Sequence, residues 1–184
     1  MRLLAISGSL RRDSHNTKLL RAAEELVSPD VDFVLYDELE SVPPYNEDHD
    51  TEYAPLAVRR LRSAIEQADG VLIATPEYNA SVPGQLKNAI DWASRPVRAG
   101  AIWGKPVAVI GASTGMYGGV WAQAELRKIL GTAGARVVDA EVAVSRAHER
   151  FDAAGRLVDG EIRDELREAV SSLVLAAGPQ LVAA

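Results

Sequence analysis

Residues 3–17, LLAISGSLRRDSHNT, decide the expected fold, because a short apolar run passes directly into a polar loop and then into a helical pattern. The run Leu3–Ile6 is continuous rather than alternating, which is typical of a strand buried on both faces of a parallel sheet. The apolar positions that follow recur at helical spacing on one face: Leu19, Ala23, Leu26 and Val27. A strand, a loop and a helix in this order predict the first unit of an α/β protein.

The same alternation continues over most of the chain. Four more strands are predicted by the apolar runs Val31–Tyr36, Val71–Ala74, Val107–Gly111 and Val137–Val144. Four more helices are predicted by Leu61, Ala64, Ile65 and Ala68, by the segment Gly84–Ser94, by Ala122, Leu126, Ile129, Leu130 and Ala133, and by Ile162, Leu166, Ala169, Val170 and Leu173. Strands and helices in alternation predict a doubly wound α/β fold. The sequence contains no repeat or linker, so residues 1–184 are expected to form a single domain.

The composition excludes several classes of function. The 184 residues include 20 Lys and Arg against 26 Asp and Glu, which gives a formal net charge of −6. This balance argues against a protein that binds nucleic acid or an anionic membrane through an excess of positive charge. The sequence has no cysteine, so disulfides, thiolate zinc sites, thiol nucleophiles and iron–sulfur clusters are excluded.

We expect a cytoplasmic protein that does not span a membrane. No run approaches the roughly 20 apolar residues of a membrane-spanning helix. The apolar run Leu3–Ile6 is too short for the core of a signal peptide. Two predicted connections are longer than is usual, from Asp37 to about Tyr53 and from Ser145 to Asp159. Long loops often border binding sites.

Polar residues follow three of the predicted strands. In an open parallel sheet, ligands bind beyond the carboxyl ends of the strands, where the winding reverses. The residues at these ends form the first loop (residues 7–17), the second loop (residues 75–79) and the third loop (residues 112–119), and all three are rich in hydroxyl, amide or glycine residues. The sequence therefore predicts that these loops build the site together.

The first loop has the chemistry of a phosphate site. Ser9, Ser14 and Thr17 supply hydroxyl groups, Asn16 an amide, and Arg11 a guanidinium that suits phosphate oxygens. Backbone N–H groups at the start of the following helix add partial positive charge. The alternative is that Ser14 or Asn16 only caps this helix.

Two common phosphate motifs do not fit the first loop. Gly8 is followed by neither the second glycine nor the lysine of a P-loop, and it stands alone where a dinucleotide fingerprint needs three glycines. Asp37 at the end of the second predicted strand resembles a ribose-binding acid, but this is weak without the glycines. A loop rich in hydroxyl groups suits a terminal phosphomonoester, such as that of FMN, better than a buried pyrophosphate.

Two signatures resemble those of the NADPH-dependent FMN reductase family, which includes chromate, azo and quinone reductases. The first signature is Gly8-Ser9-Leu10-Arg11 followed by Ser14 and Asn16. The second is Thr75-Pro76-Glu77-Tyr78-Asn79, continued by Pro83-Gly84 and by Leu86-Lys87-Asn88-Ala89-Ile90-Asp91-Trp92. The resemblance covers roughly residues 2–140 and departs from the family at His15, where an aromatic residue is frequent.

The resemblance implies a flavodoxin-like fold, with five parallel strands in the order 2-1-3-4-5 and helices on both faces. It implies that the FMN phosphate is held by Ser9, Arg11, Ser14, Asn16 and Thr17. The isoalloxazine edge and ribityl chain would lie along Pro76, Glu77, Tyr78 and Asn79, and the far side of the ring would meet Ser113, Thr114 and Gly115, in a loop shaped by Gly118.

The activity implied is hydride transfer from NADPH (or NADH) through FMN to a small-molecule acceptor: a quinone, azo dye, nitroaromatic, chromate or free flavin. The cofactor carries this chemistry, so we assign no catalytic side chain. No metal is assigned to His15, His49 or His148. The resemblance also implies a homodimer or homotetramer.

Several side chains have simpler interpretations. Tyr78 and Trp92 are candidates for packing aromatics, and Trp92 is the stronger one because it lies two turns into a helix. Lys87 and Asp91 are four residues apart and are expected to form a surface ion pair worth a few tenths of a kcal/mol. Glu77 remains open as a general base. An FMN-binding electron carrier and a signalling domain without flavin remain as alternative functions.

Overall fold

The computed structural model of the protein describes residues 1–178. Its helices and strands are β1 (Arg2–Ser7), α1 (His15–Glu24), β2 (Asp32–Tyr36), α2 (Leu56–Gln67), β3 (Gly70–Thr75), α3 (Gly84–Ala93), β4 (Pro106–Ala112), α4 (Val120–Thr132), β5 (Arg136–Val137), β6 (Ala143–Val144) and α5 (Gly160–Ala177). All strand pairs are parallel, in the order β2-β1-β3-β4-β5, and β6 pairs with β4 further along that strand. The expected flavodoxin-like α/β fold and its strand order are confirmed.

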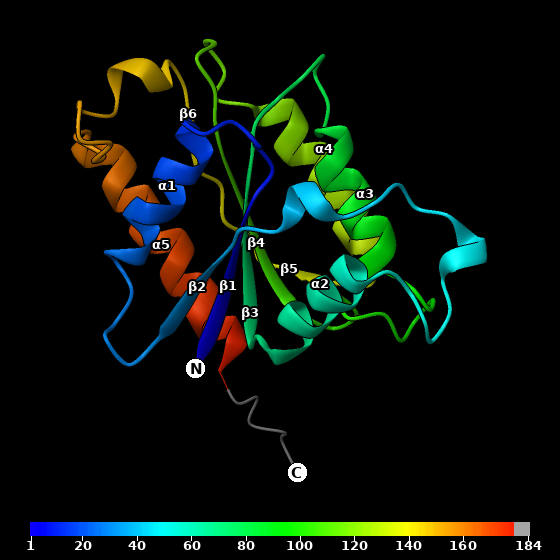
Figure 1. Ribbon diagram of the computed structural model, residues 1–184. Helices are drawn as coiled ribbons and strands as arrows, with labels where there is room; N and C mark the ends of the chain where they lie inside the picture. Colours follow the sequence, from blue (N-terminus) through cyan, green and yellow to red (C-terminus); the bar gives the residue numbers. More distant parts are fainter. Residues whose placement is uncertain (179–184) are drawn as a thin grey trace.

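The sheet is covered by helices on both faces (Figure 1). Helices α1 and α5 pack on one face, around Leu3, Leu72 and Ile110, and helices α2, α3 and α4 pack on the other, around Leu4, Ile73 and Val109. Strands β3 and β4 are buried along their whole length. Their continuous apolar sequences follow from this, because a central strand with a helix layer on each side has no solvent-facing position.

The fifth strand is the one element that the sequence predicts wrongly. The apolar run Val137–Val144 was expected to be continuous, but only its two ends pair with β4, as β5 and β6. Asp139 and Glu141 interrupt the run and are exposed. Because a sheet edge between two helix layers cannot bury carboxylates without partners, the chain leaves the sheet here. Where the chain has left the sheet, the guanidinium of Arg127 lies between the two segments. It donates to the carbonyl of Val109 in β4 at 2.9 Å and to that of Ala140.

The long loop (residues 37–53) is fixed to one face of α3. Gln85 donates from Nε2 to the carbonyls of Leu39 and Val42, at 2.7 and 2.8 Å. Asn88 accepts from the backbone N–H of Tyr45 at 2.7 Å and donates to the carbonyl of Pro43 at 2.9 Å. The indole Nε1 of Trp92 donates to the same carbonyl at 2.8 Å. Positions 85, 88 and 92 share one helix face, so this part of the second signature holds the loop.

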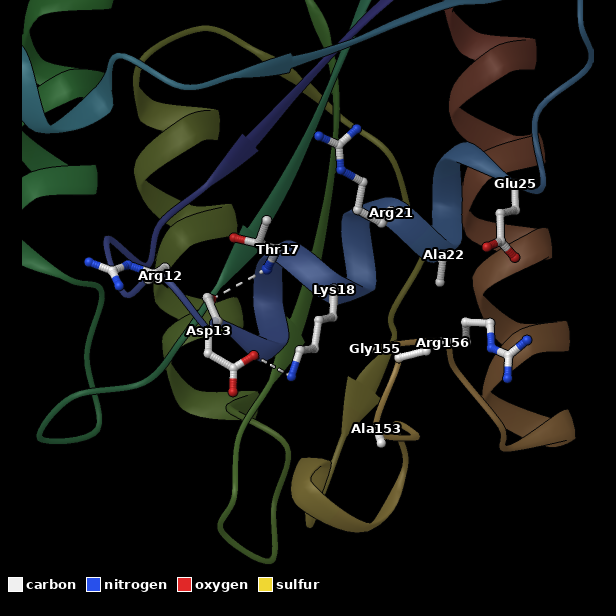
Figure 2. Close-up of a pocket in the computed structure, with 12 residues that line it drawn as sticks. Arg12, Asp13, Thr17, Lys18, Arg21, Ala22, Glu25, Ala153, Gly155 and Arg156 are labelled. Atoms are coloured by element: carbon white, nitrogen blue, oxygen red, sulfur yellow. Dashed lines mark hydrogen bonds and ion pairs between the residues drawn. The ribbon is translucent and has the colours of Figure 1, made fainter.

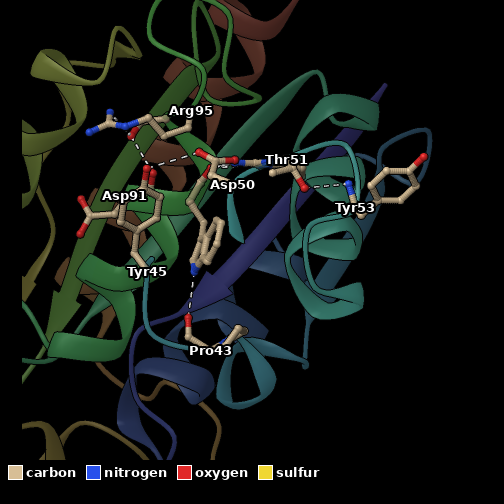
Figure 3. A network of polar contacts seen from close by, with 10 residues as sticks. Pro43, Tyr45, Asp50, Thr51, Tyr53, Asp91 and Arg95 are labelled. Carbon is tan, nitrogen blue, oxygen red and sulfur yellow. Dashed lines mark hydrogen bonds and ion pairs between the residues drawn. The ribbon is translucent and has the colours of Figure 1, made fainter. Parts of the chain in front are cut away.

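A second set of contacts secures the same loop (Figure 3). Arg62 of α2 forms a largely buried ion pair with Asp50 at 2.7 Å and also donates to the carbonyl of Trp92. The ring of Tyr45 meets that of Trp92 edge to face, with centroids 4.8 Å apart, and the guanidinium of Arg95 lies over the Tyr45 ring. The prediction that Trp92 is a packing aromatic is therefore confirmed, since its exposed fraction is 0%.

The other long connection, residues 145–159, packs against the N-terminal end of α1. Phe151 pairs with Leu157 through an isolated antiparallel bridge, and both side chains are buried. Arg150 forms an ion pair with Asp159 at 2.7 Å. Asp159 also accepts from the backbone N–H of Ile162 and so caps α5. These contacts place the Phe151 ring against the beginning of α1.

Candidate functional site

The three loops that were predicted to build the site meet at the carboxyl ends of β1, β3 and β4. Together they line a narrow cavity of about 100 Å³. The predicted residues that line it are Ser9, Arg11, Ser14, Asn16, Pro76, Glu77, Tyr78, Ser113 and Thr114, and the cavity is completed by His15 and Ala112. The loops meet because β1, β3 and β4 are neighbours in the sheet, so their ends lie on one edge at the point where the winding reverses.

A larger and more open hollow of about 370 Å³ adjoins this cavity at Arg11 and Tyr78. Residues of the first signature and of the segment that contains the second line it together: Gly8, Leu10, Arg11, Tyr78, Pro83, Gly84 and Gln85. A side chain at Gly8 would lie 2.8 Å from the Leu86 side chain, so a larger residue here would require Leu86 to move. The exposed fraction of Tyr78 is 51%, which argues against the interpretation of this ring as a packing aromatic.

The hydroxyl groups of the first loop are joined to each other and to α1. Ser14 is the N-cap of α1, and its Oγ accepts from the backbone N–H groups of Asn16 and Thr17 at 3.2 and 3.3 Å. Ser14 therefore caps α1, and it also lines the cavity. Thr17 donates from Oγ1 to Ser7 Oγ at 3.0 Å, behind the loop and outside the cavity. Ser7, which was not predicted as a site residue, also bonds to the backbone of Ser9.

Asn16 joins the first loop to the third. Its Nδ2 donates to the carbonyl of Ala112 and its Oδ1 accepts from the N–H of the same residue, both at 2.9 Å. The Asn16 side chain is 3% exposed. Both the amide nitrogen and the amide oxygen of Asn16 are thus hydrogen-bonded to the backbone of Ala112. Both residues line the cavity.

Arg11 and His15 face the cavity in different ways. Arg11 is exposed and makes one long hydrogen bond, from its guanidinium to the carbonyl of Asp13 at 3.3 Å, which leaves the group available to a ligand. His15 is partly buried, and its ring stacks on that of Phe151 with centroids 5.8 Å apart. The ring of His15 therefore does not simply face solvent.

The second loop connects β3 to the beginning of α4 through Glu77. The Oε2 atom of Glu77 accepts from the backbone N–H groups of Trp121 and Ala122, both at 3.1 Å. A carboxylate is favoured at this end of a helix because the unpaired N–H groups carry partial positive charge. Glu77 therefore positions the third loop, and this carboxylate oxygen is not free to act as a general base.

We expect Glu77→Ala to lower the free energy of unfolding by about 1–2 kcal/mol, because two N–H groups of α4 lose their acceptor. Glu77→Gln keeps an acceptor oxygen without the charge, and we expect it to recover part of the loss. Urea unfolding of both variants measures this. Glu125→Ala, on the exposed face of the same helix, is the matched control and should change stability by less than about 0.5 kcal/mol. An equal loss in Glu77→Ala and Glu125→Ala would contradict the capping role.

Asn79 lies at the tip of a tight turn and does not line the cavity. Tyr78 and Ser81 exchange two backbone hydrogen bonds of 3.1 Å, and the residues between them, Asn79 and Ala80, have φ values of 53° and 58°. Two central residues with positive φ are typical of a hairpin turn, in which asparagine is favoured. The turn geometry explains asparagine at this position, whatever it contacts.

The third loop is held from behind by the segment around β6. Ser113 accepts at Oγ from the N–H of Gly115 at 3.1 Å, and the carbonyl of Gly115 accepts from the backbone N–H of Arg146 at 2.9 Å. Gly118 has a φ of 62°, and a side chain there would lie 2.4 Å from the carbonyl carbon of Ala143. Gly118 therefore shapes the loop, as expected, but its close neighbour is β6.

A second groove of about 330 Å³, which the sequence did not indicate, lies between α1 and residues 153–156 (Figure 2). Ser14 and Thr17 line it on their outer side. Most of its charged side chains are paired, as in Lys18 with Asp13 at 2.5 Å and Arg21 with Glu24 at 2.8 Å. The hydrogen bond from Lys18 lowers the pKa of Asp13.

Two kinds of feature are absent from residues 1–178. No group of His, Asp or Glu side chains within this range is arranged to hold a metal ion. No helix among these residues is both long and apolar enough to cross a membrane.

Comparison with known proteins gives a consistent result. The family model of NADPH-dependent FMN reductases matches residues 1–149. The chain is 44% identical over 176 residues to an NAD(P)H-dependent FMN reductase of Pseudomonas aeruginosa, covering 95% of this chain and 94% of that protein. It is 39% identical over 168 residues to a 2-hydroxy-1,4-benzoquinone reductase of a Burkholderia species, covering 91% of each.

A solved structure agrees with these sequence matches. The flavoenzyme NAD(P)H:(acceptor) oxidoreductase FerB of Paracoccus denitrificans superposes with a TM-score of 0.83 at 37% identity, over 96% of each chain. The resemblance inferred from the two signatures is thus confirmed over most of the sequence. This chain belongs to the NADPH-dependent FMN reductase family of oxidoreductases.

Proposed function

We propose that this protein binds FMN with its phosphate in the 100 Å³ cavity and catalyses NAD(P)H-dependent reduction of a small-molecule acceptor. The observation that carries the proposal is the cavity itself, where three loops bring hydroxyl, amide and guanidinium groups to one edge of the sheet. We favour a quinone as the acceptor, because a relative at 39% identity is named as a benzoquinone reductase. An azo dye, a nitroaromatic, chromate or free flavin would accept electrons from the same site.

The residues present fit FMN. The cavity adjoins the N-terminal end of α1, where the helix dipole favours an anion, and Arg11 faces it with a guanidinium that makes one long hydrogen bond. The adjoining hollow has the apolar surface of Leu10, Tyr78 and Pro83 beside Gly8 and Gly84, which suits a flat ring. Among residues 1–178, Glu77 supplies the one carboxylate that lines the cavity, and it is hydrogen-bonded to α4.

The roles of the side chains follow from this fit. Bound FMN supplies the hydride chemistry. Ser9, Ser14 and Arg11 bind the phosphate, and Asn16 and Thr17 hold the first loop in place. Pro76, Glu77 and Tyr78 line one side of the cavity, and we propose that Asn79 extends this side toward the flavin ring. Ser113 and Thr114 line the opposite side, and we propose that Gly115 and Gly118 continue this side beyond the cavity.

The visible absorption spectrum tests the proposal directly. Purified protein should be yellow or become so when FMN is added, and the colour should bleach when NADPH is added without oxygen and return with a benzoquinone. Protein that binds FMN but does not oxidise NADPH or NADH would instead be an electron carrier. Protein that neither binds FMN nor oxidises NADPH would contradict the proposal.

Three further statements are part of the proposal. The chain acts as a single domain of residues 1–184, in the cytoplasm, and forms a homodimer or homotetramer. Several large apolar side chains near the site are at least half exposed: Tyr78, Met116, Tyr117 and Trp121. They support an assembly in which another copy covers part of this surface. Light scattering of the purified protein measures its mass, and a monomer at micromolar concentration would contradict the assembly.

We expect Arg11→Ala to weaken FMN binding by roughly ten- to a hundredfold, because one charge-assisted hydrogen bond is worth about 1.5–3 kcal/mol. Titration of the apoprotein with FMN measures the change. Riboflavin, which lacks the phosphate, should bind the variant and the unchanged protein equally. Arg12→Ala is the matched control, since Arg12 is its neighbour and does not line the cavity. An unchanged FMN affinity in Arg11→Ala would remove Arg11 from the phosphate site.

A further inference from the structure

His15 is the residue of the cavity that the two signatures do not explain. It is the first residue of α1 and lies between the N-cap Ser14 and the buried Asn16. It lines the same cavity as Ser9 and Arg11. The imidazole is therefore located where the N–H groups of a helix and the hydroxyl groups of the first loop converge.

The ring of His15 is fixed in orientation. It stacks on Phe151, with the centroids 5.8 Å apart and the planes 25° from parallel. Its Nδ1 atom is buried and has no hydrogen-bond partner among residues 1–178. A buried polar atom without a partner is costly and rare. The imidazole of His15 therefore has unmet hydrogen-bonding capacity beside the cavity that this residue lines.

The groups around the ring disfavour its protonated form in the protein alone. Burial lowers the pKa of His15 below its ordinary value, and the cations Lys18 and Arg11 lower it further. Asp13 acts in the opposite direction, and His148, from the 145–159 segment, adds a small lowering effect. Glu77 shares the cavity, but its carboxylate is hydrogen-bonded to α4.

We infer that His15 is an ionisable contact of the FMN phosphate and takes up a proton from solvent when the flavin binds. The inference rests on the proposed function, and it adds a specificity for the phosphate dianion to that function. A dianion beside the ring favours the imidazolium and raises the pKa of His15 from its lowered value. At a pH between the values of the free and the bound protein, binding is therefore accompanied by proton uptake.

The pH dependence has two opposing parts. The phosphate of FMN has its own second pKa near 6, so below about pH 6 the flavin carries less charge and binds less tightly. Protonation of His15 strengthens binding over the same range. The contribution of His15 is therefore measured by the ratio of dissociation constants between a His15 variant and the unchanged protein, in which the titration of the phosphate cancels.

The experiment titrates the full-length apoprotein with FMN between pH 5.5 and 8.5, for the unchanged protein, His15→Gln, His15→Phe and the control His148→Gln. We expect His15→Gln to bind FMN within about threefold of the unchanged protein at pH 8.5 and about tenfold more weakly at pH 6, the worth of one charge-assisted contact. His148→Gln should follow the unchanged protein throughout. Riboflavin should show no difference between the proteins at any pH.

A measurement on the unchanged protein makes the test independent of how the variants fold. NMR titration of the His15 ring protons should give a pKa at least one unit higher in the FMN complex than in the apoprotein. A ratio of dissociation constants that is constant with pH, a similar ratio for riboflavin, or an unchanged His15 pKa would overturn the inference while leaving the proposed function intact. Failure to bind FMN at every pH would overturn both.

Discussion

Trp92→Ala is expected to lower the free energy of unfolding by about 3–5 kcal/mol, the cost of removing a fully buried large aromatic side chain. The indole is 0% exposed, and its Nε1 donates to the carbonyl of Pro43 at 2.8 Å. Its ring also meets Tyr45 edge to face and lies under the guanidinium of Arg62, 5.6 Å from the ring centroid. The substitution therefore opens a cavity and releases the long loop from α3.

Urea unfolding, followed by circular dichroism, measures this effect. Trp92→Phe keeps most of the packing and loses the hydrogen bond to Pro43, so it should lie between the unchanged protein and Trp92→Ala. Trp121→Ala is the control, because the Trp121 side chain is half exposed and its loss should cost less than about 1 kcal/mol. If Trp92→Ala cost no more than Trp121→Ala, the anchoring of the long loop by Trp92 would be incorrect.

Asn16→Ala is expected to lower the free energy of unfolding by about 2–5 kcal/mol, since the buried N–H and C=O of Ala112 both lose their partner. The first and third loops are then no longer joined, so we also expect FMN affinity to fall. Urea unfolding and FMN titration measure the two effects.

A second substitution of Asn16 separates its effect on stability from its effect on FMN affinity, and a substitution of Asn46 serves as the control. Asn16→Asp keeps one acceptor for the Ala112 N–H but places a carboxylate near the Ala112 carbonyl and the phosphate site. It should therefore lose less stability than Asn16→Ala and more FMN affinity. Asn46→Ala is the control, because Asn46 is exposed and accepts one local hydrogen bond, from Asp48. Unchanged stability and affinity in Asn16→Ala would contradict the assigned role.

Local sequence patterns were sufficient where the physics is local. Continuous apolar runs such as Leu3–Ile6 and Val107–Gly111 predicted strands buried on both faces, and β1 and β4 are such strands. Lys87 and Asp91 form the expected exposed ion pair at 2.7 Å, because four residues span one helical turn. The prediction of one strand over Val137–Val144 was wrong because Asp139 and Glu141 interrupt the run. These two carboxylates divide it into two short strands.

Contacts between distant segments could not be read from such patterns. Asn16 was interpreted as a phosphate ligand, because nothing near it in sequence indicates Ala112 as its partner 96 residues away. Gly118 was expected to shape the third loop, but its close contact with the backbone of Ala143, in another segment, could not be anticipated. The ring of His15 could not be placed without Phe151, which lies 136 positions further along the chain.

The amino-acid sequence by itself determined the alternating α/β architecture, the three polar strand ends and membership of the reductase family, because periodicity and signatures are properties of neighbouring residues. Only the tertiary structure decided which polar groups of those loops are already committed to one another, as Asn16 is to Ala112 and Glu77 to α4, and which remain open to a ligand, as Arg11 and His15 do. The physical reason is that a hydrogen-bonding group is satisfied by whatever the fold brings within about 3 Å of it, and sequence spacing does not specify that neighbour.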